Sequence, residues 1–153
     1  MNEVSIQEAD FDAGAEIAAL TAGDLSAGAV ASFVGLVRGG EVASMTLEHY
    51  PGMTEKALSE IVAEAKSRWR LLAVRVIHRV GRLLPGDRIV FVAVSSSHRH
   101  EAFAACEFIM DYLKTRAPFW KKEETDGGGR WVDARESDDA AADRWDGGRI
   151  RPT

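Results

Sequence analysis

Two lysines in the second half of the chain have the residue type and spacing best suited to catalysis. Lys114 lies near the end of an expected helix, and Lys121 follows seven residues later, beyond Pro118. Because a helix–turn–strand corner would bring these like charges together, one lysine could lose its proton near neutral pH and act as a nucleophile or general base. The other could stay charged and hold a phosphate or a developing oxyanion. Spacing alone favours a plainer interpretation, in which Lys114 complements the helix dipole and Lys121 is solvated.

Other residues have types that suit an anionic ligand. Residues 95–97 are three serines that leave an apolar strand and enter the same helix, whose first turn offers free backbone N–H groups. His98 and Arg99 stand at this point and could add donors, although a serine N-cap with both side chains in solvent explains them equally well. Arg38 and Arg135 each close an expected strand. An arginine fork suits phosphate, but a strand-ending arginine usually faces water.

Neither the histidines nor the cysteine form a convincing metal or thiol site. His98 and His100 are one residue apart, with no second cluster at zinc spacing, so we expect no metal site and no cofactor. Cys106 falls on the apolar face of its helix and is interpreted as a buried structural thiol. Phe119 and Trp120 lie between the two lysines and could wall a pocket for a flat ring, although such a pair is more often core.

The composition limits the classes of function. The chain has 153 residues with a net charge of −5, but residues 75–122 hold nine Lys and Arg against four acids. Such a segment could focus positive potential on a small anion, or could be a solvated basic face. The acidic total and the lack of a binding motif argue against nucleic acid. With one cysteine, no signal peptide and no apolar run of about 20 residues, we expect a cytoplasmic protein that does not enter a membrane.

The apolar pattern predicts alternating strands and helices. Helices are expected over 12–22, 54–69 and 101–114, the second with Thr54 as its N-cap. Strands are expected over 28–38, 45–50, 73–80, 88–95, 119–124 and 130–134. This order predicts a single α+β domain over residues 1–146, with a mostly antiparallel mixed sheet and packed helices. Residues 147–153 are expected to form a disordered tail.

Long stretches of the chain resemble the large subunit of molybdopterin synthase. The most specific strings are LEHYPGMTEKAL at residues 47–58 and FIMDYLKTRAPFWKKE at residues 108–123. Shorter matches occur at residues 33–38 (FVGLVR), 77–81 (IHRVG), 85–87 (PGD), 97–99 (SHR), 131–132 (WV) and 134–136 (ARE). The resemblance extends from about Gly28 to Trp145. The first 27 residues and the tail after Trp145 carry no recognisable motif.

The resemblance implies an activity and an assembly. The family is a sulfurtransferase that makes the molybdopterin dithiolene from cyclic pyranopterin monophosphate, in the biosynthesis of the molybdenum cofactor. Its sulfur comes from the C-terminal thiocarboxylate of a small ubiquitin-like partner subunit with a Gly-Gly tail. The family assembles as a heterotetramer with a homodimer of large subunits at its core. The implied fold is of the α/β hammerhead type.

The resemblance also assigns roles to residues. Lys114 and Lys121 match the family's two active-site lysines. Arg38, His98 and Arg99 match its substrate-pocket residues, and Arg135 matches an arginine contributed across the dimer interface. Lys114 is the better candidate to contact the carbonyl of the tail or a substrate intermediate, with Lys121 as acid/base or charge stabiliser.

A rival interpretation is a non-catalytic docking module for a ubiquitin-like protein. Such a module needs a groove for the tail, but it does not need two lysines beside a group of arginines. A generic nucleotide-binding domain is a weaker alternative, since the sequence has no phosphate-binding glycine loop.

Overall fold

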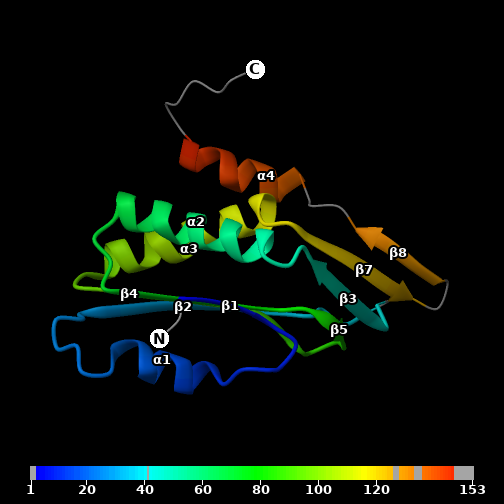
Figure 1. The fold of residues 1–153 in the computed structure, drawn as a ribbon, viewed down its shortest axis with the longest axis horizontal. Coiled ribbons are helices and arrows are strands. Elements are labelled where there is room, and N and C mark those ends of the chain that lie inside the picture. The colour runs from blue at the N-terminus through cyan, green and yellow to red at the C-terminus, as the bar shows by residue number, and fades with distance from the viewer. Residues whose placement is uncertain (1–2, 41, 126–127, 133–135, 147–153) are drawn as a thin grey trace.

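Two four-stranded sheets and their packed helices form an α+β fold in the computed structural model (Figure 1), which describes residues 3–40, 42–125, 128–132 and 136–146. In chain order the elements are β1 (Val4–Gln7), α1 (Ala13–Thr21), β2 (Ala29–Leu36), β3 (Ser44–His49), α2 (Met53–Arg68), β4 (Ala73–Arg79), β5 (Gly81–Leu83), β6 (Arg88–Ser96), α3 (Arg99–Arg116), β7 (Phe119–Thr125), β8 (Gly128–Val132), α4 (Glu136–Asp143) and the short 3₁₀ helix η1 (Arg144–Asp146). The expected fold class is confirmed.

The first sheet has the strand order β1-β4-β6-β2 and carries the main core. Only the β1–β4 pair is parallel; β4–β6 and β6–β2 are antiparallel. Helices α2 and α3 cover one face of this sheet and α1 covers the other (Figure 1). Because both faces are covered, β6 is buried continuously from Val90 to Ser96, as its unbroken apolar sequence predicts.

Helix α1 changes the burial pattern that the sequence predicts for β4. Alternation predicts a half-buried strand with Ile77 on the outer face. Ile77 is instead 1% exposed, because it packs beneath α1 with Phe11, Leu20 and Phe91. Strand β1 was not predicted, since four residues of mixed polarity become a strand only by pairing with β4.

The second sheet is wholly antiparallel and has the order β5-β3-β7-β8. It extends from one end of the first sheet (Figure 1). A small core of Val37, Met45, Leu47 and Leu83 holds β3 and β5 together. The strands expected over 45–50, 119–124 and 130–134 are confirmed within two residues at each end, and this sheet carries Lys121.

The start of α2 corrects one prediction. Gly52, with φ of +85°, is the N-cap, and the Glu55 carboxylate accepts a hydrogen bond from the Gly52 N–H at 2.6 Å. Thr54 lies inside the helix and is fully buried. Its hydroxyl accepts from the Tyr50 N–H at 2.9 Å and donates to the Pro118 carbonyl at 3.1 Å. The threonine therefore ties the start of α2 to the corner between α3 and β7.

Helix α4 and η1 were not predicted, and they pack over α3. Two aspartates anchor them: Trp145 Nε1 donates to Asp111 at 2.6 Å, and the Tyr112 hydroxyl donates to Asp146 at 2.5 Å. The predicted tail at 147–153 lies outside the described residues. In the described part of the chain, no helix is both long and apolar enough to cross a membrane.

Candidate active site

Helix α3 separates the predicted site residues into two groups. His98 is its N-cap and Arg99 its first residue, whereas Lys114 lies in its last turn. Fifteen residues separate Arg99 from Lys114, which at 1.5 Å per residue is about 22 Å along the axis. One copy of the chain therefore does not bring these two groups into one site.

The register of the first sheet places Arg38 at the lysine end of α3. Strand β6 leads directly into α3, which folds back over it, so the end of the helix lies above the start of β6. Leu36 at the end of β2 pairs with Arg88 at the start of β6. Arg38, two residues beyond β2, is exposed at this same end.

The predicted corner between the two lysines is confirmed. Helix α3 ends at Arg116, and β7 begins at Phe119, whose N–H donates to the Ala117 carbonyl at 2.9 Å. Lys114 is exposed, and Lys121 is half-buried between Leu47 of β3 and Val132 of β8.

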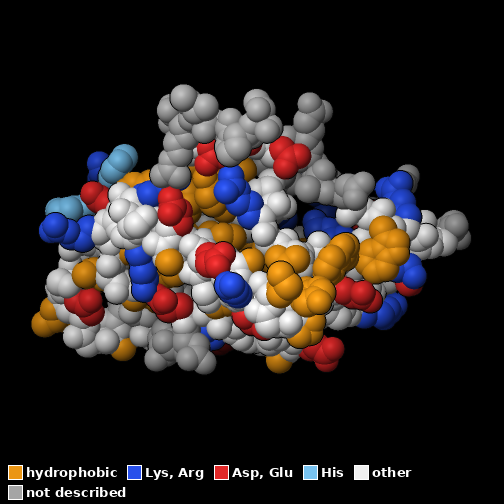
Figure 2. Space-filling model, turned by 45° about the horizontal axis from the view of Figure 1, so that its top comes forward, with side chains coloured by type: hydrophobic (Ala, Val, Ile, Leu, Met, Phe, Trp, Pro, Cys, Tyr) orange, Lys and Arg blue, Asp and Glu red, His pale blue; other side chains and the backbone are white. Residues whose placement is uncertain are grey.

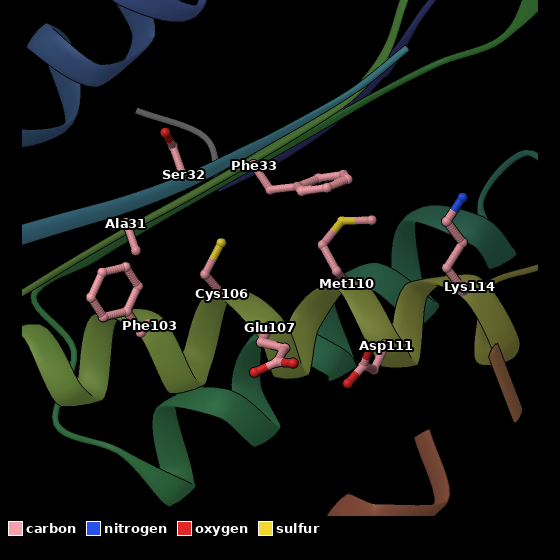
Figure 3. A pocket seen from close by; sticks show the side chains of 9 residues that line it. All are labelled: Ala31, Ser32, Phe33, Phe103, Cys106, Glu107, Met110, Asp111 and Lys114. Atoms are coloured by element: carbon pink, nitrogen blue, oxygen red, sulfur yellow. The ribbon is translucent and has the colours of Figure 1, made fainter. Parts of the chain in front are cut away.

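A groove of about 610 Å³ runs between α3 and β2 and reaches Lys114. In Figure 3 the side chains of Cys106, Met110 and Lys114 extend from successive turns of α3 toward β2, where Phe33 meets them. Apolar side chains make up most of the wall, Glu107 and Asp111 also line it, and the Lys114 ammonium group lies at one end. The sequence analysis did not identify Phe33 or Met110 as site residues, because each fits the apolar face of its own element.

The Cys106 thiol in this groove is not an activated nucleophile. Burial, and to a lesser extent the carboxylate of Glu107, raise its pKa to about 11. The thiol thus stays protonated at neutral pH, and its Sγ lies 3.9 Å from the Val92 carbonyl. The interpretation of Cys106 as a buried thiol is confirmed.

His78 of β4 is a buried polar residue beside the lysines. Its ring stacks on Phe119, with 3.7 Å between ring centroids and 16° between planes. Its Nδ1 lies 2.8 Å from the Arg79 carbonyl oxygen. Since a carbonyl only accepts hydrogen bonds, Nδ1 carries the proton and Nε2 carries the lone pair.

The charge state of His78 follows from its surroundings. Its pKa is lowered to about 4, mainly by burial and also by the nearby Lys114, Lys121 and His49, although the bond to the Arg79 carbonyl opposes this. The imidazole is therefore neutral near pH 7. The sequence analysis did not single out His78; the signal that could have identified it is a lone titratable residue in a strand of valines and isoleucine.

The remaining predicted residues are less enclosed. Figure 2 shows histidine and basic side chains gathered at the left-hand end of the molecule, the end at which α3 begins in Figure 1. Trp120 is 47% exposed, while Phe119 packs against the main core, and neither lines the groove. Arg135 lies outside the described residues.

Comparison with known proteins identifies the family. A sequence model described as "MoaE protein" matches residues 6–116. The chain belongs to the MoaE family. The molybdopterin synthase catalytic subunit of Ralstonia nicotianae is 64% identical over 149 residues, which cover 95% of this chain and 85% of that protein.

Solved MoaE structures share the fold. The molybdopterin biosynthesis MoaE protein of Burkholderia ambifaria is 63% identical, with a TM-score of 0.83 over 95% of this chain and 98% of that one. The molybdopterin synthase structure from Staphylococcus aureus is 31% identical, with a TM-score of 0.79 over 86% of this chain and 98% of that one. The resemblance to the large subunit of molybdopterin synthase is confirmed.

Proposed function

We propose that this chain is the catalytic subunit of molybdopterin synthase, a sulfurtransferase of molybdenum cofactor biosynthesis. It moves sulfur from the C-terminal thiocarboxylate of a small ubiquitin-like subunit to cyclic pyranopterin monophosphate, and so makes the molybdopterin dithiolene. The observation that carries the proposal is the apolar groove between α3 and β2 that reaches Lys114. The name of the Ralstonia nicotianae relative supports it, and the word "catalytic subunit" in that name implies a second kind of subunit.

The groove suits the extended tail of such a partner. A Gly-Gly terminus has no side chains, so its backbone can approach Phe33 and Met110 closely. The thiocarboxylate then reaches Lys114, whose ammonium group offers hydrogen-bond donors and positive charge. A docking module would need the groove, but it would not need a lysine at the groove's end.

The two lysines divide the catalytic work in this proposal. Attack of the thiocarboxylate sulfur on the pterin expels an oxygen substituent of the pterin and turns the tail into an acyl thioester. When water then attacks the acyl carbon, negative charge develops on the acyl oxygen of the tail, and a cation held beside that oxygen stabilises it. Cleavage of the acyl C–S bond leaves the sulfur on the pterin and a carboxylate on the tail. Lys114 contacts this carbonyl or the intermediate that follows. Lys121, half-buried on β7, acts as acid/base or as a second charge stabiliser.

A second copy of the chain completes the site in this proposal. His98 and Arg99 lie about 22 Å along α3 from Lys114 in one copy, so the pair that serves each lysine site comes from the partner copy, together with Arg135. Their donors, with Arg38, hold the phosphate of the pterin. The assembly is a heterotetramer: a homodimer core with one small subunit at each end.

The same proposal covers the chain's organisation and location. Residues 1–146 act as one catalytic domain. The protein works in the cytoplasm without a cofactor, consistent with a single buried cysteine.

Reconstitution tests the proposal. The purified chain is mixed with thiocarboxylated small subunit and cyclic pyranopterin monophosphate, and dithiolene product is measured. Product is expected with the wild-type chain and not with the partner alone. Absence of product would contradict the sulfurtransferase function.

A binding measurement separates catalysis from docking. We expect the chain to bind the pterin without its partner, and Arg38→Ala and Arg99→Ala to weaken that binding. A chain that binds the small subunit but has no affinity for the pterin would be a docking module.

A further inference from the structure

Two carboxylates line the groove that is proposed to receive a negatively charged tail. Glu107 and Asp111 lie one turn apart on α3, and Asp111 is one turn before Lys114. In Figure 3 both carboxylates are turned away from β2, along the rim of the groove. One helical turn rises about 5.4 Å, which is less than the Debye length of about 8 Å, so both charges act on an anion in the groove. Their repulsion opposes the approach of a thiocarboxylate to Lys114.

Arg144 of η1 pairs with both carboxylates. Its Nη2 donates to Asp111 Oδ2 at 3.0 Å and also forms an ion pair with Glu107 Oε1. Trp145, the next residue, donates from Nε1 to the same Asp111 oxygen at 2.6 Å. The C-terminal segment of the described chain therefore places one positive charge against the two negative charges on the rim.

We infer that Arg144 is a positioning residue, which partly neutralises Glu107 and Asp111 so that the thiocarboxylate of the partner's tail can reach Lys114. This inference deepens the proposed function and rests on it. Arg144 acts through the two carboxylates and does not need to touch the tail. Its role is to set the affinity of the groove for a tail that ends in a negative charge.

The spacing of the two acids explains why they need a partner. Glu107 and Asp111 are four residues apart on one helix, an arrangement in which like charges repel each other. Lys114 follows Asp111 by three residues, so the Asp111 carboxylate is also placed to compete with the tail for the Lys114 ammonium group. Arg144 and Trp145 hold that carboxylate toward η1, which reduces this competition.

Anchoring of η1 does not account for the ion pairs of Arg144. The Trp145 ring packs edge-on against Trp69 and Phe108, with 5.6 Å between ring centroids in each pair. The Trp145 carbonyl also accepts a hydrogen bond from Arg68 Nη1 at 2.8 Å. The Arg144 side chain is 50% exposed, and ion pairs at such positions contribute little to stability. Trp145 therefore holds η1 in place, and the charge of Arg144 requires another explanation.

A series of variants with stepped charge tests the inference. Two carboxylates and one guanidinium give the rim a net charge of −1 in the wild-type chain. The charge becomes −2 in Arg144→Gln, +1 in the double variant Glu107→Gln/Asp111→Asn, and 0 in the triple variant that combines all three changes. Calorimetry at low salt measures the dissociation constant for the small subunit with its tail in the stable carboxylate form.

The affinity should rise with the charge of the rim. Arg144→Gln should bind the carboxylate tail about 3- to 10-fold more weakly than the wild-type chain, the size of one or two solvent-screened charge contacts. The triple variant should bind at least as tightly as the wild-type chain, and the double variant more tightly still. Arg144→Lys keeps the positive charge and should bind nearly as tightly as the wild-type chain.

A structural role predicts a different order. If the ion pairs serve only to anchor η1, the single, double and triple variants lack them alike and bind the small subunit equally weakly. In Asp111→Asn the amide oxygen can still accept from Trp145, so the other contacts of η1 are kept. Equal affinities in the three variants would overturn the inference.

Two controls isolate the charge of the tail. Arg70→Gln removes a positive charge from an exposed position after α2, and its affinity should stay within about 2-fold of the wild-type value, because salt screens distant exposed charges. A small subunit with an amidated C-terminus has a neutral tail, so its affinity should vary little across the series. A series that is equally steep for amidated and carboxylate tails would contradict the inference.

The double variant covers the case in which Arg144→Gln does not fold. By itself it should bind the carboxylate tail more tightly than the wild-type chain, and weaker binding would overturn the inference. If the wild-type chain makes no dithiolene product, the proposed function itself is wrong, and this outcome is distinct from the order of affinities.

Discussion

The two ends of α3 are built differently. At the lysine end, the corner at Pro118 is tied to α2 by Thr54, and His78 is enclosed between the two sheets. At the other end, His98 and Arg99 are exposed, and His98 makes no side-chain capping bond. One end is thus a packed site with fixed geometry, and the other is an open cationic surface. Chemistry that needs fixed lysines belongs at the first end; recognition of an anion carried by another molecule suits the second.

The largest expected effect is the loss of the lysine at the packed end. Lys114→Ala should lower the rate of dithiolene formation about 1,000-fold, the size expected when a group that stabilises a developing charge is removed. Since Lys114 is exposed, the melting temperature should change little. Lys56→Ala, at an exposed position of α2, is the matched control and should keep wild-type activity. Full activity in Lys114→Ala would contradict the assignment of Lys114 as a catalytic residue.

Acid should weaken the packed end through His78. Its pKa is about 4 in the folded chain, against a usual value of 6.5, so between these pH values the unfolded chain binds more protons. The contribution of His78 to the unfolding free energy is therefore fully present above pH 6.5. It falls by about 3 kcal/mol as the pH falls toward 4. His78→Phe removes this contribution, while Lys114, Lys121 and His49, whose charges act on the ring, stay in place.

Urea unfolding at pH 7 and at pH 4.5 measures this difference. The wild-type chain should lose more of its unfolding free energy than His78→Phe between these two pH values. Parallel losses in the two proteins would show that His78 is not held neutral by the fold.

A smaller effect is expected from the tie between α2 and the lysine corner. Thr54→Val keeps the side-chain shape but leaves the Tyr50 N–H and the Pro118 carbonyl without their partner, which should lower the unfolding free energy by about 2 kcal/mol. Thr54→Ser retains the hydroxyl and serves as the control. If the corner positions the lysines, Thr54→Val should also lower kcat, and Thr54→Ser should lower it less. Equal kcat values in all three proteins would mean that the corner keeps its geometry without the threonine.

Much of the lysine end could be predicted from the sequence. Pro118 must end α3, so the corner between Lys114 and Lys121 follows from local chemistry. The apolar run of β6 likewise fixes a central strand. The parts that depend on distant contacts were missed. Ile77 is buried because α1 lies over it, and His78 becomes notable only because Phe119 folds against it.

The separation of the two ends of α3 carries a different lesson. Residues 95–122 look like one site because they are contiguous, yet a continuous helix moves Arg99 and Lys114 apart by about 22 Å. Residues of one contiguous segment can therefore lie far apart in space when that segment is a long helix. The length of the predicted helix already implies this separation. The proposal that Arg99 serves the site of a second copy could not come from the spacing in one sequence.

Mixing two inactive variants tests the central claim most directly. Lys114→Ala and Arg99→Ala are each expected to be inactive, because every site in either homodimer lacks one group. In a mixed dimer, one site receives both altered groups and the other receives neither. Random mixing should therefore restore about a quarter of the wild-type dithiolene activity. If the two variants stay inactive after exchange of subunits is verified, the two ends of α3 do not meet across copies, and the account of the site is wrong.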